Sequence, residues 1–163
     1  MKPHSALVLL AALATGLRAQ QKSPEGPFRY NGNGHVYFAA GACQHGYKHV
    51  GVGGGGEGFL WRGLALGADV GYHHFVDDIG FGLMSLHLGY HFADRKKPKG
   101  FDPVVNVTLL GAYLANGIGP AGSLGVVLNY WFKKRIGLRT EVRFQALNGE
   151  EALSVFRVGL SFR

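Results

Sequence analysis

The feature that most constrains this chain is an alternation of apolar residues with small or polar ones, repeated from about residue 35 to the end. It is clearest in the segments 64–73, 82–92, 122–132, 136–146 and 154–163. A period of two residues is that of a β-strand, whose successive side chains point to opposite faces. These segments are predicted to be strands with one apolar face and one small or polar face.

Three weaker runs, 35–43, 49–60 and 103–114, bring the predicted number of strands to eight. On one face of the last run we expect Val105, Val107, Leu109 and Tyr113. Leu110 is predicted to lie on the opposite face. Turn residues separate the runs and no helical segment interrupts them, so neighbouring strands are predicted to pair as antiparallel hairpins.

Composition supports an all-β chain. Glycine supplies 27 of 163 residues, far above its usual share of about 7%, which disfavours an ordinary helical or α/β domain. Apolar and aromatic residues are spread through the length of the chain, which disfavours disorder. A helical membrane span is excluded because no apolar run reaches about 18 residues, but a transmembrane barrel needs only alternate apolar residues.

The first residues are predicted to be a signal peptide. Residues 1–4 are basic, residues 5–17 are apolar but too few to span a bilayer, and Ala19 offers a small residue at a cleavage point. We therefore expect a signal peptide over 1–19, a flexible leader over 20–32 and the barrel over 33–163. Cys43 is the single cysteine of this exported chain, so no internal disulfide is expected.

Residue size indicates which face of the strands points inward. An eight-stranded barrel has an interior barely wide enough for its own side chains. The polar face combines many glycines with large residues such as Tyr37 and Trp131, which fits a crowded lumen. The other face is apolar, with aromatic residues at its ends, which fits a band in lipid. The predicted fold is all-β: a closed eight-stranded antiparallel up-and-down transmembrane β-barrel after a cleavable signal peptide.

Acidic and basic residues occur in equal numbers on the polar face. The predicted lumen charge network consists of Glu57, Asp69, Arg139, Glu141, Arg143 and Arg157. An unpaired charge in a low-dielectric interior costs several kcal/mol, so these groups are expected to pair with one another and plug the barrel. A relay for protons or ions along the same residues is the alternative.

Two further patterns suggest a nucleotide site and a metal site, but the sequence around them does not fit either site. Gly51–Gly56 matches the nucleotide-binding G-x-G-x-x-G, yet no helix start follows it. His87 and His91 would lie about 13 Å apart along one strand. His73 and His74 would point to opposite faces. We therefore predict no cofactor-binding residues and no metal ligands.

Two basic clusters, Arg95–Lys99 and Lys133–Arg135, fall in predicted turns at the same end of the barrel. With the amino terminus in the periplasm, as is usual for such barrels, this end faces the periplasm. The clusters are interpreted either as solvated turns or as contacts with anionic lipid headgroups. Nucleic acid is not expected as a partner of an exported chain.

The final strand and the eight-strand pattern resemble a known superfamily, the small eight-stranded outer-membrane β-barrels of the outer membrane protein A and outer membrane protein X type. The residues that carry the resemblance in the last strand are Phe156, Val158, Leu160 and Phe162. The resemblance implies a monomer in the outer membrane of a Gram-negative bacterium, in contact with outer-membrane lipid. It also implies that the barrel-assembly machinery recognises these four residues. Family members usually end on the aromatic residue itself, whereas here Arg163 follows it.

The chain is accordingly predicted to be a non-enzymatic integral barrel with a plugged lumen, a structural or interaction role and at most weak permeability. No catalytic residues are predicted. One alternative is an enzyme acting on outer-leaflet lipid, for which His74, Ser85 and Asp77 lie near one hairpin. The other is a soluble lipocalin-like ligand carrier. A fold alone does not decide between such functions.

Overall fold

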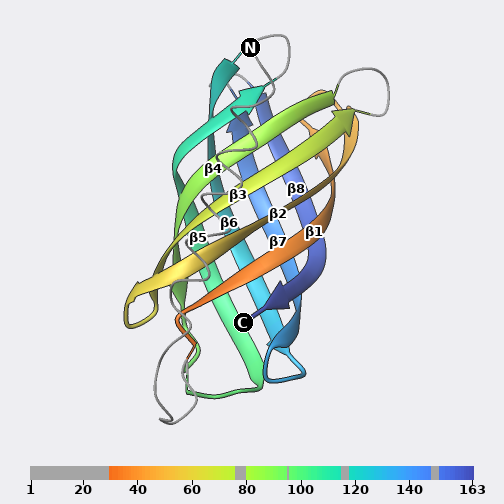
Figure 1. Ribbon diagram of the computed structural model, residues 1–163. Helices are drawn as coiled ribbons and strands as arrows, with labels where there is room; N and C mark the ends of the chain where they lie inside the picture. Colours follow the sequence, from red (N-terminus) through yellow and green to blue (C-terminus); the bar gives the residue numbers. More distant parts are fainter. Residues whose placement is uncertain (1–29, 76–79, 95, 115–117, 148–150) are drawn as a thin grey trace, which may run out of the picture.

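Eight antiparallel strands form a closed barrel in the computed structural model (Figure 1). The structure describes residues 30–75, 80–94, 96–114, 118–147 and 151–163. The strands are β1 (Gly32–Cys43), β2 (Lys48–Trp61), β3 (Leu64–Phe75), β4 (Gly80–His91), β5 (Gly100–Leu114), β6 (Ile118–Trp131), β7 (Ile136–Leu147) and β8 (Glu151–Phe162). Each strand pairs with its sequence neighbours, and β8 pairs with β1 to close the sheet. The predicted closed eight-stranded antiparallel barrel is confirmed.

The two ends of the barrel differ in which segments lie there. β1 begins and β8 ends at the lower end in Figure 1, together with the β2–β3, β4–β5 and β6–β7 turns. The β1–β2 turn lies at the opposite, upper end. Within the described residues no helix has the length and apolarity that a membrane crossing would require.

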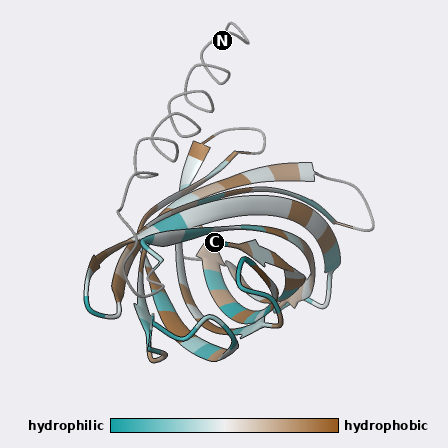
Figure 2. Cartoon of the chain, turned by 60° about the horizontal axis from the view of Figure 1, so that its bottom comes forward, coloured by the Kyte–Doolittle hydropathy of each residue, from teal (hydrophilic) through white to brown (hydrophobic). Residues whose placement is uncertain are grey.

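The sequence alternation forms the two faces of the barrel wall. Hydrophobic and hydrophilic residues alternate along the strands in Figure 2. In β7, for example, Arg139, Glu141 and Arg143 are buried, while the neighbouring Leu138 and Val142 are exposed. The outer face therefore carries apolar residues and the lumen holds the charged ones, as residue size predicted.

Glycines in the wall make room for large side chains in the lumen. A methyl group placed on Gly71 would lie 2.6 Å from the hydroxyl oxygen of Tyr37. A methyl group on Gly137 would lie 2.9 Å from Cε3 of Trp131. Both distances are shorter than van der Waals contact, so the glycines on the inner face are a packing requirement of this narrow barrel.

A bulge in β5 changes the faces of one strand. The β5–β6 pairing passes from Val107 with Leu124 to Ala112 with Pro120, so β5 uses one more residue than β6 over this interval. The extra residue reverses the alternation beyond it.

The residues beyond the bulge therefore lie on the faces opposite to those expected. Leu110 is 68% exposed on the outer face, and Tyr113 packs against the apolar cluster of the lumen. The prediction that Tyr113 shares the outer face and that Leu110 opposes it was wrong for this reason.

An apolar cluster fills the lumen near the upper end. Its buried members are Tyr37, Ala39, Cys43, Phe81, Leu83, Leu147, Leu153 and Val155. His49 and His73 lie beside this cluster, with the ring of His73 stacked on Phe81 at a centroid separation of 5.4 Å. The upper part of the lumen therefore contains an apolar cluster bordered by two buried histidines.

The packing of this cluster predicts that Cys43 reacts slowly with thiol reagents. Its side chain is buried on the inner face, and reagents reach a buried thiol only when the structure opens locally. We expect maleimide labelling of the folded barrel in detergent to be slower than that of the urea-unfolded chain by roughly tenfold or more. A Cys43→Ala/Gln44→Cys variant, with its thiol in the exposed turn, should label rapidly in both states. Rapid labelling of folded Cys43 would contradict the inward position of its side chain.

Candidate functional site

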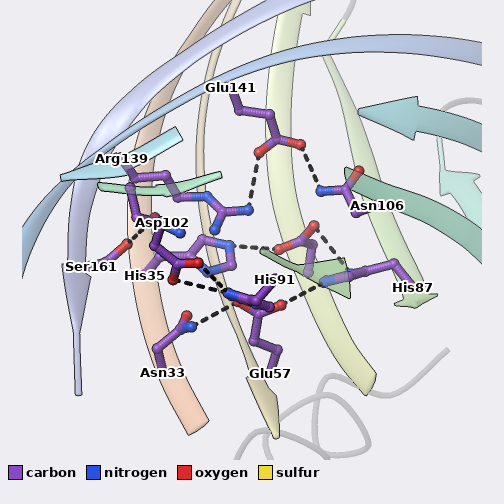
Figure 3. Close-up of polar contacts among 12 residues, drawn as sticks. Asn33, His35, Glu57, His87, His91, Asp102, Asn106, Arg139, Glu141 and Ser161 are labelled. Atoms are coloured by element: carbon purple, nitrogen blue, oxygen red, sulfur yellow. Dashed lines mark hydrogen bonds and ion pairs between the residues drawn. The ribbon is translucent and has the colours of Figure 1, made fainter. Parts of the chain in front are cut away.

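The middle of the lumen is filled by charged side chains that come from opposite walls of the barrel (Figure 3). The six predicted members of the charge network are all buried, with exposures of 5% or less for Glu57, Asp69, Arg139, Glu141, Arg143 and Arg157. The structure brings five of these residues into direct contact and places Glu57 in a second group nearer the lower end.

Glu141 on β7 is surrounded by three guanidinium groups. Arg143 Nε donates to Glu141 Oε1 at 2.6 Å, and Arg139 Nη2 donates to Oε2 at 3.3 Å. Both arginines are two residues away on the same strand, so strand geometry places all three side chains on one face. Arg157 is the direct cross-strand partner of Glu141 on β8, with Nη1 3.8 Å from Oε2.

Asp69 carries the network across the lumen from β3. Arg143 Nη2 donates to Asp69 Oδ2 at 2.8 Å, although the two residues are 74 positions apart in the sequence. His35 Nε2 lies 2.7 Å from Asp69 Oδ1, and Arg157 Nη1 lies 3.6 Å from Oδ2. Since Arg143 contacts both Asp69 and Glu141, it connects opposite walls of the barrel.

The second group of charges contains two residues that the sequence analysis did not include. His91 at the end of β4 lies between two carboxylates, with Nδ1 2.9 Å from Asp102 Oδ2 and Nε2 3.0 Å from Glu57 Oε1. Asn33 Nδ2 also donates to Glu57 Oε1 at 2.7 Å. An ionised carboxylate only accepts hydrogen bonds, so this geometry fits a His91 that carries a proton on both ring nitrogens.

The expected charge balance of three acids against three bases needs correction. Asp102 is fully buried and adds a fourth acid, and a doubly protonated His91 adds a fourth base. Asp102 was missed because the strand was predicted to begin at 103, whereas β5 begins at Gly100. The signal was present in the sequence, since Asp102, Val104 and Asn106 occupy alternate positions and all three are buried.

His87 lies between the two groups of charges. Its Nδ1 is 3.6 Å from Asp69 Oδ2, and its Nε2 is 4.0 Å from Glu57 Oε2. Carboxylates and imidazoles therefore follow one another along the lumen from Asp102 to Asp69. This arrangement can hold the walls together electrostatically, and it is also the order of groups that the alternative of a proton relay would use.

Aromatic residues surround the Arg163 guanidinium at the lower end of the barrel. The guanidinium carbon of Arg163 lies 3.7 Å from the ring centroid of Tyr30 and 3.6 Å from that of Trp131. The Tyr30 hydroxyl donates to Asp102 Oδ2 at 3.2 Å. Burial, reinforced by the Asp102 carboxylate, raises the pKa of Tyr30 above its usual value, so the phenol keeps its proton. Tyr30 belongs to the predicted leader, and most of that segment and the predicted signal peptide lie outside the described residues.

A small cavity lies beside the charge network. Its volume is about 10 Å³, and Asp69, Arg143 and Arg157 contribute to its lining. A space of this size holds about one water molecule. It is far too small for a sugar or a lipid chain.

Two of the three residues considered for an enzyme lie on opposite faces of the wall. His74 is exposed on the outer face, whereas Ser85 lies on the inner face, where it pairs with Asp69 across β3 and β4. Asp77 lies outside the described residues. Among the residues that the structure describes, no group of three or more His, Cys, Asp or Glu side chains has the arrangement of a metal site.

Solved structures with the same architecture are similar to the chain over most of its length. Neisserial surface protein A (NspA) aligns with a TM-score of 0.64 at 14% identity, covering 85% of this chain and 99% of NspA. The chain has the fold of the small eight-stranded outer-membrane β-barrels. No family model matches the sequence, and neither does any curated protein.

Other outer-membrane barrels share this fold. The amino-terminal β-barrel domain of Pseudomonas aeruginosa OprF aligns with a TM-score of 0.60 at 19% identity, covering 82% of this chain and 98% of that domain. The outer membrane enzyme PagL aligns with a TM-score of 0.57 at 12% identity, covering 78% of this chain and 97% of PagL. An enzyme thus shares the architecture, so function depends on the residues rather than on the fold.

Proposed function

We propose that the protein is a non-enzymatic integral β-barrel of the bacterial outer membrane, with a plugged lumen and a structural or interaction role. The observation that carries this proposal is the distribution of side chains across the wall. Exposed apolar residues such as Leu66, Leu128 and Val158 cover the outside, while ionised groups fill the inside. A soluble carrier would need the opposite arrangement, together with an empty apolar interior for its ligand.

The last strand supports assembly in the outer membrane. Phe156, Val158, Leu160 and Phe162 all lie on the outer face of β8, where they are 39–51% exposed. They pair through the backbone with β1 and β7 and so stand at the closure of the barrel. We propose that the barrel-assembly machinery recognises this alternating face.

A plugged lumen predicts that the wild-type protein gives no steady conductance in planar bilayers. The narrow interior is filled by its own side chains, including Tyr37 and the stacked Arg157, whose guanidinium carbon is 4.2 Å from the Tyr37 ring centroid. A Tyr37→Ala/Arg157→Ala variant should conduct ions, because it removes this pair beside the existing cavity. A Phe38→Ala variant is the matched control, since Phe38 neighbours Tyr37 on the outer face. Large, stable openings in the wild type would refute the plugged lumen.

Gel mobility tests the membrane barrel itself. A folded transmembrane barrel should migrate as a compact species before heating and as a slower species after boiling, and it should need detergent to stay in solution. One unchanged band from a detergent-free monomer would support the soluble carrier instead. Release of fatty acid from lipopolysaccharide by the purified protein would support the enzyme.

A further inference from the structure

The lower end of the barrel carries exposed cations in all three of its turns. These residues, called here the basic rim, are Arg62, Lys96, Lys97, Lys99, Lys133, Lys134 and Arg135. They belong to the β2–β3, β4–β5 and β6–β7 turns, which follow one another around the barrel.

Exposed acidic residues do not balance the basic rim in the described part of the chain. Of the carboxylates whose side chains the structure describes, Glu57, Asp69, Asp102 and Glu141 are buried in the lumen. Asp94 is the remaining one, and its Oδ1 accepts a hydrogen bond from the backbone N–H of Lys96 at 3.0 Å. Four of the five described acids therefore lie in the lumen, and basic residues outnumber acidic ones at the described part of the lower rim.

An aromatic band borders the basic rim on the outer wall. Its exposed members are Trp61, Tyr90, Phe92, Phe101, Tyr130, Phe132 and Phe162. Neighbouring rings contact one another, with centroids 5.0 Å apart for Tyr90 and Phe92 and 4.8 Å apart for Phe101 and Tyr130. The guanidinium of Arg62 stacks over the Trp61 ring at 4.5 Å. Aromatic girdles mark the level of the lipid headgroups in membrane barrels.

We propose that the basic rim binds the phosphate groups of anionic glycerophospholipids in the leaflet on the side of the lower end. The inference rests on the proposed membrane insertion and adds a lipid class to it. Cations directly outside an aromatic girdle lie at the depth of the headgroup phosphates, and anionic lipid attracts each of them.

The shape of the rim favours lipid headgroups over a single soluble polyanion. The cations occupy three separate turns around the barrel rather than one groove. Many small anionic headgroups arranged around the protein match this distribution, whereas a glycan or nucleic acid chain would need a continuous track. The lower end holds the start of β1 and the end of β8, and the usual topology places this end at the periplasmic leaflet.

The test measures which lipid collects around the full-length protein in a bilayer. The protein is reconstituted in phosphatidylcholine vesicles that contain a trace of spin-labelled phosphatidylglycerol or spin-labelled phosphatidylcholine, and the motionally restricted fraction of each label is recorded. We expect phosphatidylglycerol to associate with the protein roughly threefold to tenfold more strongly than phosphatidylcholine at low salt. The preference should fall towards equality in 1 M NaCl, where charge interactions are screened.

Three variants locate the effect. Replacing Lys96, Lys97, Lys99, Lys133 and Lys134 by glutamine should abolish most of the preference. The same five positions replaced by arginine retain the charge and should retain the preference. Lys48→Gln removes an exposed cation at the upper end and should leave the preference unchanged.

The outcomes separate this inference from the proposed function. Heat-dependent gel mobility of the same vesicles reports insertion, and a chain that does not insert contradicts the proposed function. An inserted barrel with equal association of both lipids overturns the inference about the rim alone. The inference is also overturned if the preference survives in the glutamine variant. It is overturned too if the same residues prefer lipid A more strongly, or if the rim binds a sulfated glycan without lipid selectivity.

Discussion

A Glu141→Gln variant is expected to lose about 3–5 kcal/mol of unfolding free energy, because removing one partner of a buried ion pair leaves its counterions uncompensated. Three guanidinium groups surround this carboxylate, and the shortest contact joins Arg143 Nε to Glu141 Oε1 at 2.6 Å. Glutamine keeps the shape of the side chain, so the loss reports the charge rather than a cavity. Urea unfolding in detergent micelles, followed by tryptophan fluorescence and gel mobility, measures the effect.

A second substitution should restore much of this loss. In a Glu141→Gln/Arg157→Gln variant, three buried acids and three buried bases remain, so the charges balance again. The acids are Glu57, Asp69 and Asp102, and the bases are Arg139, Arg143 and a protonated His91. The double variant is therefore expected to be more stable than Glu141→Gln alone. Thr140→Ala, next to Glu141 in β7, is the control and should change stability little. A Glu141→Gln variant as stable as the wild type would refute the structural importance of the network.

A Val126→Arg variant should destabilise the folded barrel in lipid vesicles by about 2–4 kcal/mol, the cost of a basic side chain on the lipid face near the bilayer midplane. Val126 lies in the middle of β6 and is 60% exposed on the outer face. If that face were in contact with water, the same substitution would change stability by no more than about 0.5 kcal/mol. Urea titration in phosphatidylcholine vesicles gives the difference.

Depth along the same strand provides the control for this prediction. Ile118 is the first residue of β6 and is 71% exposed. An Ile118→Arg variant should lose only about 0–1 kcal/mol, because the cost of a charge falls towards the membrane interface. Equal losses at both positions would contradict a bilayer around the barrel, and a neutral Val126→Arg would favour the soluble carrier.

The wall of the barrel could be predicted from local sequence patterns. Alternation assigned Arg139, Glu141 and Arg143 to one face, and the pairing of glycines with Tyr37 and Trp131 identified that face as the lumen. Both arguments work because strand geometry fixes the direction of each side chain and because a narrow barrel tolerates few large residues at one level. The bulge in β5 interrupts this alternation, and no residue pattern in the sequence predicts it. The faces of Leu110 and Tyr113 were therefore predicted incorrectly.

Which charged side chains pair across the lumen is decided by the tertiary structure. Asp69 on β3 contacts Arg143 on β7, and Glu57 on β2 contacts His91 on β4. In both contacts the two strands are not neighbours in the sheet. Alternation predicts which face of a strand a residue occupies. Which side chains of opposite walls lie at the same level of the lumen depends on the tilt and register of the strands in the closed sheet. The inward and outward faces therefore follow from the residues along each strand, whereas the charge partners follow only from barrel closure.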